Sequence, residues 1–324
     1  MAYQKKLLQR LSTAMLLAIC LLSSTSYAGN LAYITNQGSD TVSVLDIASQ
    51  KILQTIAVGK APVGVAISKK SKHIYISNAN SQTISVLDSQ SNKIIQEISV
   101  NIQPVGITIS RDGRTLFAAD WSGEQVLAID AAHPQQQKAF KAGKTPSGMV
   151  VSADNHKLFI ANRDSNNITV VDVQSLKQIA QIPVGLHPFA LNLSPDGKTL
   201  YVVNVVSNSL TLLNTDTFKT DTIKTGQHPY GAAISPDGQW IYVTNNHADS
   251  VSVINAATKQ TVSTIPVGEF PEGIDYDRDT QQLVVANWGT DNLSIIDAKT
   301  NKVINTIPTN KLCRSFGQFI LEEK

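Results

Sequence analysis

Tyr242-Val243-Thr244-Asn245 is one of seven similar four-residue segments that recur along the chain. Successive segments begin 42, 42, 42, 42, 41 and 42 residues apart. A constant period of this length indicates a repeat protein, and its regularity leaves no room for a second domain between repeats. The other six segments are Tyr33–Asn36, Tyr75–Asn78, Phe117–Asp120, Phe159–Asn162, Tyr201–Asn204 and Val284–Asn287.

One repeat contains four short β-strand signals, which we call strands A to D. In the repeat that starts at Gly185 they are Ala190–Ser194, Leu200–Asn204, Ser209–Asn214 and Thr220–Thr225. Ser194-Pro195-Asp196-Gly197 forms a tight turn between the first two, because Pro presets φ and Gly tolerates a positive φ. Four-stranded units of this length without helices are typical of propeller blades. The sequence therefore predicts an all-β fold, a seven-bladed β-propeller of antiparallel blades over residues 29–324.

The two ends of the repeat array indicate how the ring closes. After residue 28 the chain begins with a strand B near Leu31, and it ends with a strand A at Ser315–Ile320. An open array would leave a long unpaired sheet edge. We therefore predict that the C-terminal strand pairs with Leu31–Asn36.

A Gly or Asn precedes each strand A, and a Pro usually follows three residues later. Gly and Asn adopt a left-handed backbone at low cost, so we predict that conformation at these positions. They are Gly59, Asn101, Gly143, Gly185, Gly226, Gly268 and Asn310. Cys313 stands where the other six repeats have Pro62, Pro104, Pro146, Pro188, Pro229 and Pro271.

Residues 1–28 are typical of a secretory signal peptide. Lys5, Lys6 and Arg10 precede a short apolar run, and Ser26-Tyr27-Ala28 supplies a cleavage site after Ala28. Ile19 disfavours lipidation of Cys20. We expect a periplasmic or secreted protein, with no membrane span in the mature chain.

Removal of residues 1–28 also changes the charge balance. The whole chain has 27 basic and 25 acidic residues, and the segment holds three basic and no acidic ones. The mature chain would carry 24 basic and 25 acidic residues, a net charge of −1. This balance disfavours nucleic acid as a partner without excluding a local basic patch. Only Cys313 would remain, so no intramolecular disulfide is possible.

The repeat resembles the YVTN-repeat β-propeller family. The resemblance is carried by Tyr242–Asn245, by Ile265-Pro266-Val267-Gly268 and by the Asp or Asn that ends each strand C, and it spans essentially residues 30–324. It implies an exported seven-bladed propeller of bacteria or archaea with a binding or scaffold role. Related propellers include lactonases, streptogramin-type lyases and redox-enzyme domains, so the resemblance implies no single activity.

The D-to-A and B-to-C loops of a propeller meet at one mouth of its channel, where repeats that bind something should diverge. The residues directly before and after this Pro, or after Cys313 in the last repeat, differ between repeats. In the first three repeats they are neither aromatic nor ionisable, whereas in the last four they include aromatic and ionisable side chains. We predict a ligand-binding mouth that includes His187, Phe189, His228, Tyr230, Phe270, Glu272, Arg314, Trp121, Trp288 and Arg163.

Two groups at this mouth have alternative interpretations. His187, His228 and His247 could hold a divalent metal ion, although carboxylate ligands are not evident and local packing of His-Pro loops explains them as well. Glu272 and Arg314 are expected to form an ion pair in which the Arg keeps the carboxylate charged, which suits anion recognition better than proton transfer.

Other candidates lie in strand A or at strand ends. Asn192 and Asp275 occupy the strand A position held elsewhere by Ala66, Thr108, Val150, Ala233 and Gly317, so they are candidate channel ligands or partners of a backbone group. Trp121 and Trp288 could anchor a partner or cover a seam between blades. Cys313, beside Arg314, could be a reactive thiol, but a small buried side chain is the simpler interpretation.

No haem-attachment, phosphate-loop, serine-elbow or dinucleotide motif occurs. We therefore expect no catalytic residue and no resident cofactor, with a divalent metal as the one possibility. The leading hypothesis is a monomeric binding scaffold for an envelope protein or a small-molecule ligand. The alternatives are a metal-assisted lactonase-like or lyase-like enzyme that uses His187, His228, Glu272 or Asp275, and an accessory protein of a periplasmic redox enzyme.

Overall fold

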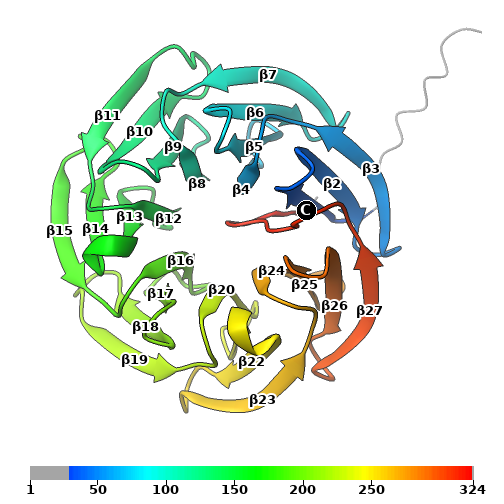
Figure 1. Ribbon diagram of the computed structural model, residues 1–324. Coiled ribbons are helices and arrows are strands. Elements are labelled where there is room, and N and C mark those ends of the chain that lie inside the picture. Colours follow the sequence, from blue (N-terminus) through cyan, green and yellow to red (C-terminus); the bar gives the residue numbers. More distant parts are fainter. Residues whose placement is uncertain (1–28, 323–324) are drawn as a thin grey trace, which may run out of the picture.

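Seven four-stranded antiparallel sheets are arranged radially around a central channel (Figure 1). This computed structural model describes residues 29–322, and the proposed signal peptide lies outside them. The fold confirms the predicted seven-bladed, all-β propeller. Its only helical turns in the described part are two 3-10 turns, η1 (Arg163–Ser165) and η2 (Asn246–Ala248).

Each blade runs from an innermost strand A to an outermost strand D. Blades 1 to 3 consist of β28 (Ile320–Leu321), β1 (Leu31–Asn36), β2 (Thr41–Asp46) and β3 (Lys51–Ala57); β4 (Pro62–Ser68), β5 (His73–Asn78), β6 (Thr83–Asp88) and β7 (Lys93–Ser99); and β8 (Pro104–Ile109), β9 (Thr115–Asp120), β10 (Gln125–Asp130) and β11 (Gln137–Lys141).

Blades 4 to 7 repeat this order with nearly equal strand lengths. They consist of β12 (Pro146–Val151), β13 (Lys157–Asn162), β14 (Asn167–Asp172) and β15 (Gln178–Pro183); β16 (Pro188–Leu193), β17 (Thr199–Asn204), β18 (Ser209–Asn214) and β19 (Thr220–Lys224); β20 (Pro229–Ile234), β21 (Trp240–Asn245), β22 (Ser250–Asn255) and β23 (Gln260–Pro266); and β24 (Pro271–Asp277), β25 (Gln282–Asn287), β26 (Asn292–Asp297) and β27 (Lys302–Pro308).

The hydrophobic core lies between the faces of neighbouring blades. Strand B is buried over most or all of its length, whereas strand D is largely exposed, as β1 and β7 show. Each strand B contributes a large buried side chain, such as Tyr33, Phe117 or Tyr242. Burial of one such side chain contributes about 1.5–3 kcal/mol to the stability of the fold.

The Asn that ends strand B joins two strands of its blade. Asn78 Nδ2 donates to Thr83 Oγ1 at 3.1 Å and to Ser85 Oγ at 2.8 Å. Corresponding bonds are made by Asn36, Asn162, Asn204, Asn245 and Asn287. The last residue of the repeated segment is therefore a structural residue.

The Gly before strand A is required because a larger side chain would collide with the Asn that ends strand B. The left-handed conformation predicted there is wrong for every one of these Gly residues. A Cβ on Gly226 would lie 2.5 Å from the Asn245 side chain, to which the Gly226 amide donates at 3.0 Å. The prediction is also wrong for Asn310, whereas Asn101, in the blade whose strand B ends in Asp120, does adopt a left-handed backbone, with φ of 48°.

The left-handed residue in six blades is the one directly before the Pro or Cys of strand A. These residues are Ala61, Thr145, His187, His228, Phe270 and Leu312, with φ between 49° and 58°. An Asp or Asn side chain accepts the amide hydrogen of five of them, as Asp249 does for Phe270 at 2.9 Å. This bond stabilises a backbone conformation that is costly for residues other than Gly.

The C-terminal segment closes the ring, as predicted, but by an irregular path. Ile320 and Leu321 pair with Ala32 and Leu31, and Cys313 forms a bridge with Asn36. Between these contacts the chain leaves the sheet, and Phe316 pairs in parallel with Gly64 of β4. Figure 1 shows this red segment projecting into the channel.

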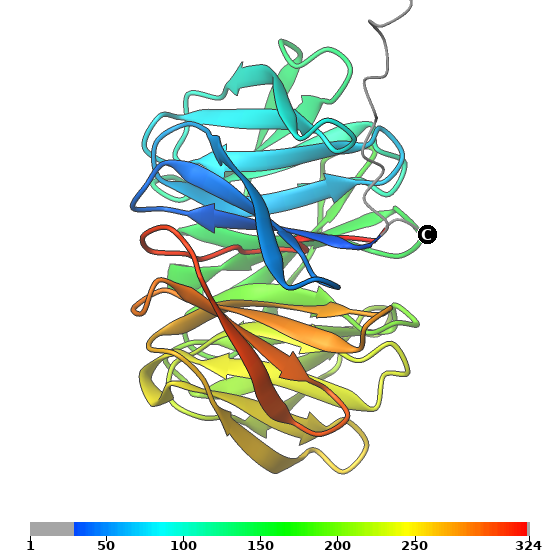
Figure 2. The same cartoon turned by 90° about the vertical axis from the view of Figure 1, so that its right-hand side faces the viewer.

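The two ends of the channel are distinct. We call the end formed by D-to-A and B-to-C loops the front face, which is toward the viewer in Figure 1 and to the left in Figure 2. The A-to-B and C-to-D loops form the back face. Within residues 29–322, no helix has the length and apolar character that a membrane span requires.

Candidate functional site

Three of the predicted mouth residues and a fourth aromatic residue form an aromatic plug at the front end of the channel. The plug consists of Trp121, Phe189, Tyr230 and Phe316. The Phe189 ring centroid lies 4.7 Å from that of Phe316, 5.0 Å from that of Tyr230 and 6.0 Å from that of Trp121. Phe189 is 4% exposed and Phe316 9% exposed, so these rings fill the channel. Sequence reasoning brought three of them together but missed Phe316, which enters only because the C-terminal segment is irregular.

Arg314 and Glu272 form the expected ion pair beside the plug. Arg314 Nε donates to Glu272 Oε2 at 2.6 Å, and Nη1 donates to Gln37 Oε1 at 2.9 Å. The guanidinium also lies 5.0 Å from the centroid of Phe316. Burial is the largest influence on the pKa of Glu272 and raises it, whereas Arg314 acts in the opposite direction. The pair joins blade 7 to the closing segment and fixes Phe316.

Arg163 and His187 lie over the other side of the plug. The Arg163 guanidinium is 5.7 Å from the centroid of the Trp121 ring and donates to Asp164 at 2.7 Å. His187 Nε2 is 3.9 Å from the same carboxylate. Asp164 therefore holds Arg163, whereas the imidazole of His187 lies near this carboxylate without a hydrogen bond to it, and its Nδ1 has no partner in the described chain.

A second set of rings follows the front rim across blades 6 and 7, and we call it the aromatic arc. It consists of His228, His247, Phe270 and Trp288. His228 and His247 stack with centroids 3.9 Å apart and planes at 11°, and edge-to-face contacts at 6.2 Å link His247 to Phe270 and Phe270 to Trp288. Phe270 is 40% exposed. Trp288 Nε1 has no hydrogen-bond partner in the described chain.

The imidazoles do not converge on one point. A metal ion lies close to the plane of each imidazole that binds it, at about 2.0–2.1 Å for zinc. The nearly parallel planes of His228 and His247 cannot both contain one ion at their separation of 3.9 Å. No group of three His, Cys, Asp or Glu residues within residues 29–322 has the arrangement of a metal site. Burial and the neighbouring His247 both lower the pKa of His228.

Asn192 and Asp275 lie in the back half of the channel, where each partners a backbone group. Asn192 Nδ2 donates to the Ala232 carbonyl at 3.1 Å, and Asp275 Oδ2 accepts the amide hydrogens of Phe319 at 2.9 Å and Ile320 at 3.0 Å. Asp275 therefore holds the closing strand.

The equivalent strand A residue of blade 1 is Phe319, not Gly317 as the sequence predicts. Phe319 lies opposite Tyr33 and accepts its amide hydrogen at 2.9 Å, as Ala66 lies opposite Tyr75 in blade 2. Gly317 has φ of 93° and belongs to the irregular segment. Relative to the other repeats, the segment before this strand contains two extra residues, which shift the register by two positions. The repeat period does not predict this insertion.

Cys313 is a buried structural residue. It is fully enclosed, and its Sγ lies 3.3 Å from the carbonyl oxygens of Asn287 and Asn292. Burial raises the pKa of the thiol to about 11, so the thiolate is disfavoured at neutral pH. The interpretation as a small buried side chain agrees with this environment.

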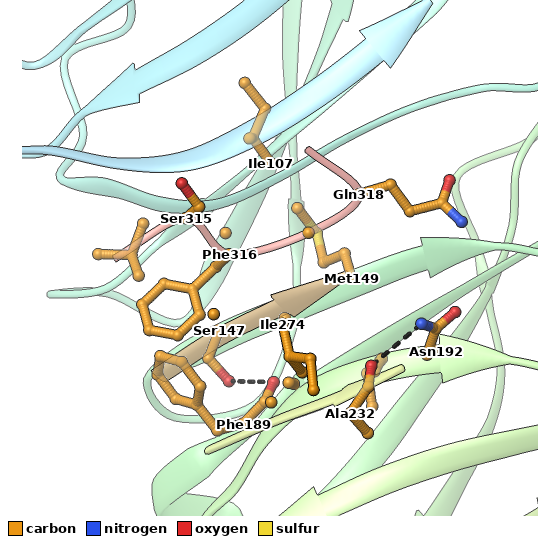
Figure 3. Close-up of a pocket in the computed structure, with 18 residues that line it drawn as sticks. Ile107, Ser147, Met149, Phe189, Asn192, Ala232, Ile274, Ser315, Phe316 and Gln318 are labelled. Carbon is orange, nitrogen blue, oxygen red and sulfur yellow. Dashed lines mark hydrogen bonds between the residues drawn. The ribbon is translucent and has the colours of Figure 1, made fainter. Parts of the chain in front are cut away.

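A small cavity follows the plug along the channel. Figure 3 shows the rings of Phe189 and Phe316 at one end of it and the amides of Asn192 and Gln318 at the other. Its volume is about 50 Å³, because glycines such as Gly106 let the innermost strands approach closely. A Cβ on Gly106 would lie 1.7 Å from the carbonyl oxygen of Ser147.

A larger cavity of about 450 Å³ opens at the back face, and sequence reasoning missed it. We call it the back cavity. Lys69, Arg111 and Arg278 line it together with Asp275 and Glu322. Near the end of strand A the repeats share a Ser, replaced by Asp in blade 7, and comparing the residue directly after it would have revealed these cations. That residue is Lys69, Arg111 and Arg278 in blades 2, 3 and 7, but Ala153, Pro195 and Pro236 in the other regular blades.

Comparisons with known proteins agree with this architecture. Residues 125–229 match the family model "Lactonase, 7-bladed beta-propeller", and residues 216–321 match "YNCE-like beta-propeller". Both matches support a seven-bladed propeller, and each covers about a third of the chain. No curated protein matches the sequence significantly.

Solved structures with this fold have diverse descriptions. The hydrazine synthase of Kuenenia stuttgartiensis is 22% identical with a TM-score of 0.73, over 82% of this chain and 91% of that one. A functionally unknown protein from Desulfotomaculum acetoxidans is 16% identical (TM-score 0.76; 88% and 98% covered). A dihydro-heme d1 dehydrogenase in complex with DHE is 15% identical (TM-score 0.70; 93% and 77% covered). At these identities the likeness concerns the fold alone.

Proposed function

We propose that this chain is an exported, non-enzymatic binding scaffold that captures an envelope protein at its front face. The observation that carries the proposal is the aromatic arc. His228, His247, Phe270 and Trp288 form a continuous row of rings on the rim, and Phe270 is 40% exposed. Exposed aromatic rings beside polar groups are typical anchors of protein interfaces.

The aromatic plug favours a protein partner over a small molecule at this face. Phe189 and Phe316 fill the front end of the channel, and Arg163 and Arg314 are held over the rings by carboxylates. A small ligand there would have to displace packed rings, whereas a protein can lie across the rim and contact the arc. Export rests on the signal-peptide pattern of residues 1–28.

Three substitutions in the arc test this proposal. A protein with His247→Ala, Phe270→Ala and Trp288→Ala should lose capture of envelope partners, because the anchors are removed while the plug stays intact. The measurement is affinity capture from envelope extract, quantified by mass spectrometry, together with photo-crosslinking from residue 247.

The matched control removes exposed apolar side chains elsewhere. Ile95, Ile179 and Val262 lie on outermost strands and are 51%, 50% and 53% exposed, and their replacement by Ala should leave capture unchanged. Equal capture by both triple variants, or no crosslink from residue 247, would reject the front face as the binding surface.

The enzyme alternative has one observation in its favour, the match of residues 125–229 to the lactonase propeller model. Two of the groups that it would use have other partners here: Arg314 holds Glu272, and Asp275 holds the closing strand. Metal analysis of the purified protein and lactone hydrolysis with added divalent ions separate the two functions. Bound metal together with turnover would favour the enzyme.

A further inference from the structure

We propose that the back cavity binds a small organic carboxylate, with the Arg111 guanidinium pairing with its carboxylate group. The cavity lies at the opposite end of the channel from the aromatic arc, so this site is independent of the proposed protein interface.

The charges that line the back cavity leave Arg111 without an acidic partner. Glu322 is shared by Lys69 at 2.8 Å and Arg278 at 3.1 Å, and Asp275 accepts backbone amides of the closing strand. Arg111 forms no ion pair with any described residue; its guanidinium has only a 3.5 Å contact with the Val151 carbonyl. Arg111 is an exposed residue whose guanidinium is partly screened from water at the cavity wall, which lowers its pKa, and no acidic group offsets this effect. An anion would supply the missing partner.

The remaining wall suits the body of an organic ligand. Val150, Leu193, Ile234 and Ile320 line the cavity on its apolar side. Gln318 adds an exposed amide that has no hydrogen-bond partner within residues 29–322. A volume of about 450 Å³ lies within the usual range of small-molecule sites, roughly 300–1,000 Å³, which also combine apolar walls with a few polar groups.

The donor set fits a carboxylate better than a phosphate. One guanidinium presents a fork that matches the two oxygens of a carboxylate. A phosphate dianion usually requires further cations or a cluster of backbone amides. Here Lys69 and Arg278 pair with Glu322, and Lys70 is not among the residues that line the back cavity.

Calorimetric titration of the protein that comprises residues 29–324 tests this assignment. The titrants are hexanoate, hexan-1-ol and inorganic phosphate at low ionic strength and pH 6, where Asp275, with a pKa that burial raises to about 7, is largely protonated. Hexanoate should bind, and Arg111→Gln should weaken it at least about 10-fold because a charged hydrogen-bonded pair is lost. Arg111→Lys should give an intermediate affinity, because it keeps the charge and loses the fork.

Arg114→Gln is the matched control, since Arg114 lies in the same loop and is 84% exposed at its side chain. It should bind hexanoate like the unchanged protein. Equal melting temperatures of the variants exclude a folding defect. Equal affinity for hexanoate and hexan-1-ol, tighter binding of phosphate, an Arg111→Gln variant with unchanged affinity, or no binding of any straight-chain carboxylate from acetate to octanoate would each overturn the proposal.

Discussion

Asp275 both holds the closing strand and lines the back cavity. Its carboxyl group accepts the amide hydrogens of Tyr276, Phe319 and Ile320, which favours the charged form. Burial opposes this effect more strongly and raises the pKa to about 7, and the Glu322 carboxylate adds to the increase. The folded protein therefore holds a proton on Asp275 at a pH where the unfolded chain has released it.

The sign of the resulting pH dependence follows from linkage. The ordinary pKa of this group is 3.8 and the folded value is about 7, so its stabilising contribution is fully present below about pH 4 and is lost as the pH rises through 7. The free energy of unfolding should fall from pH 5 to pH 8 relative to Asp275→Asn, by about 2–3 kcal/mol. Urea unfolding at four pH values measures the difference. Parallel pH profiles of the two proteins would refute this prediction.

Within each repeat, the sequence predicts which positions are constant. It does not predict why a particular residue is required at each of them. Composition and period identified the strands, the Asn that ends strand B and the Gly before strand A. The local argument for a left-handed Gly failed because the Gly is required by a side chain 19 residues later, as Asn162 and Gly143 show. Such a contact between two loops cannot be derived from the backbone preferences of one residue.

Gly226→Ala tests this contact. The new Cβ would lie 2.5 Å from Asn245 and would displace the side chain that accepts the Gly226 amide hydrogen and links β21 to β22. We expect a loss of about 1–3 kcal/mol in the free energy of unfolding, because a buried hydrogen-bond network is disturbed. Gly29→Ala is the control, since its Cβ meets only ordinary contacts at 3.4 Å. Equal stability of the two variants would show that the close packing is unimportant.

The candidate site also contains residues that the sequence predicts and one that it does not. The mouth residues Phe189, Tyr230 and Trp121 were predicted because the repeats diverge at their positions. The fourth ring of the plug, Phe316, was not predicted, because the irregular C-terminal segment brings it against Phe189 and Tyr230. The two extra residues beside Gly317 appear once in the chain, so a repeat period carries no information about them.

Across the molecule as a whole, the closing segment takes part in the ring closure, in the aromatic plug and in the back cavity. Its first part places Arg314 and Phe316 in the aromatic plug, and its last part pairs with β1 and sends Glu322 to Lys69 and Arg278. It therefore closes the ring, fills the front of the channel and completes the wall of the back cavity. Our central claim is that this one short segment closes the ring and shapes both ends of the channel.

Deletion of residues 315–324 tests that claim most directly. The truncated chain would expose the inner edge of β1 and remove Phe316 and Phe319 from the core. Thermal unfolding followed by circular dichroism should show no cooperative native transition, whereas the protein ending at Lys324 should show one. A truncated protein that melts at the same temperature and with the same cooperativity as the full chain would contradict the account.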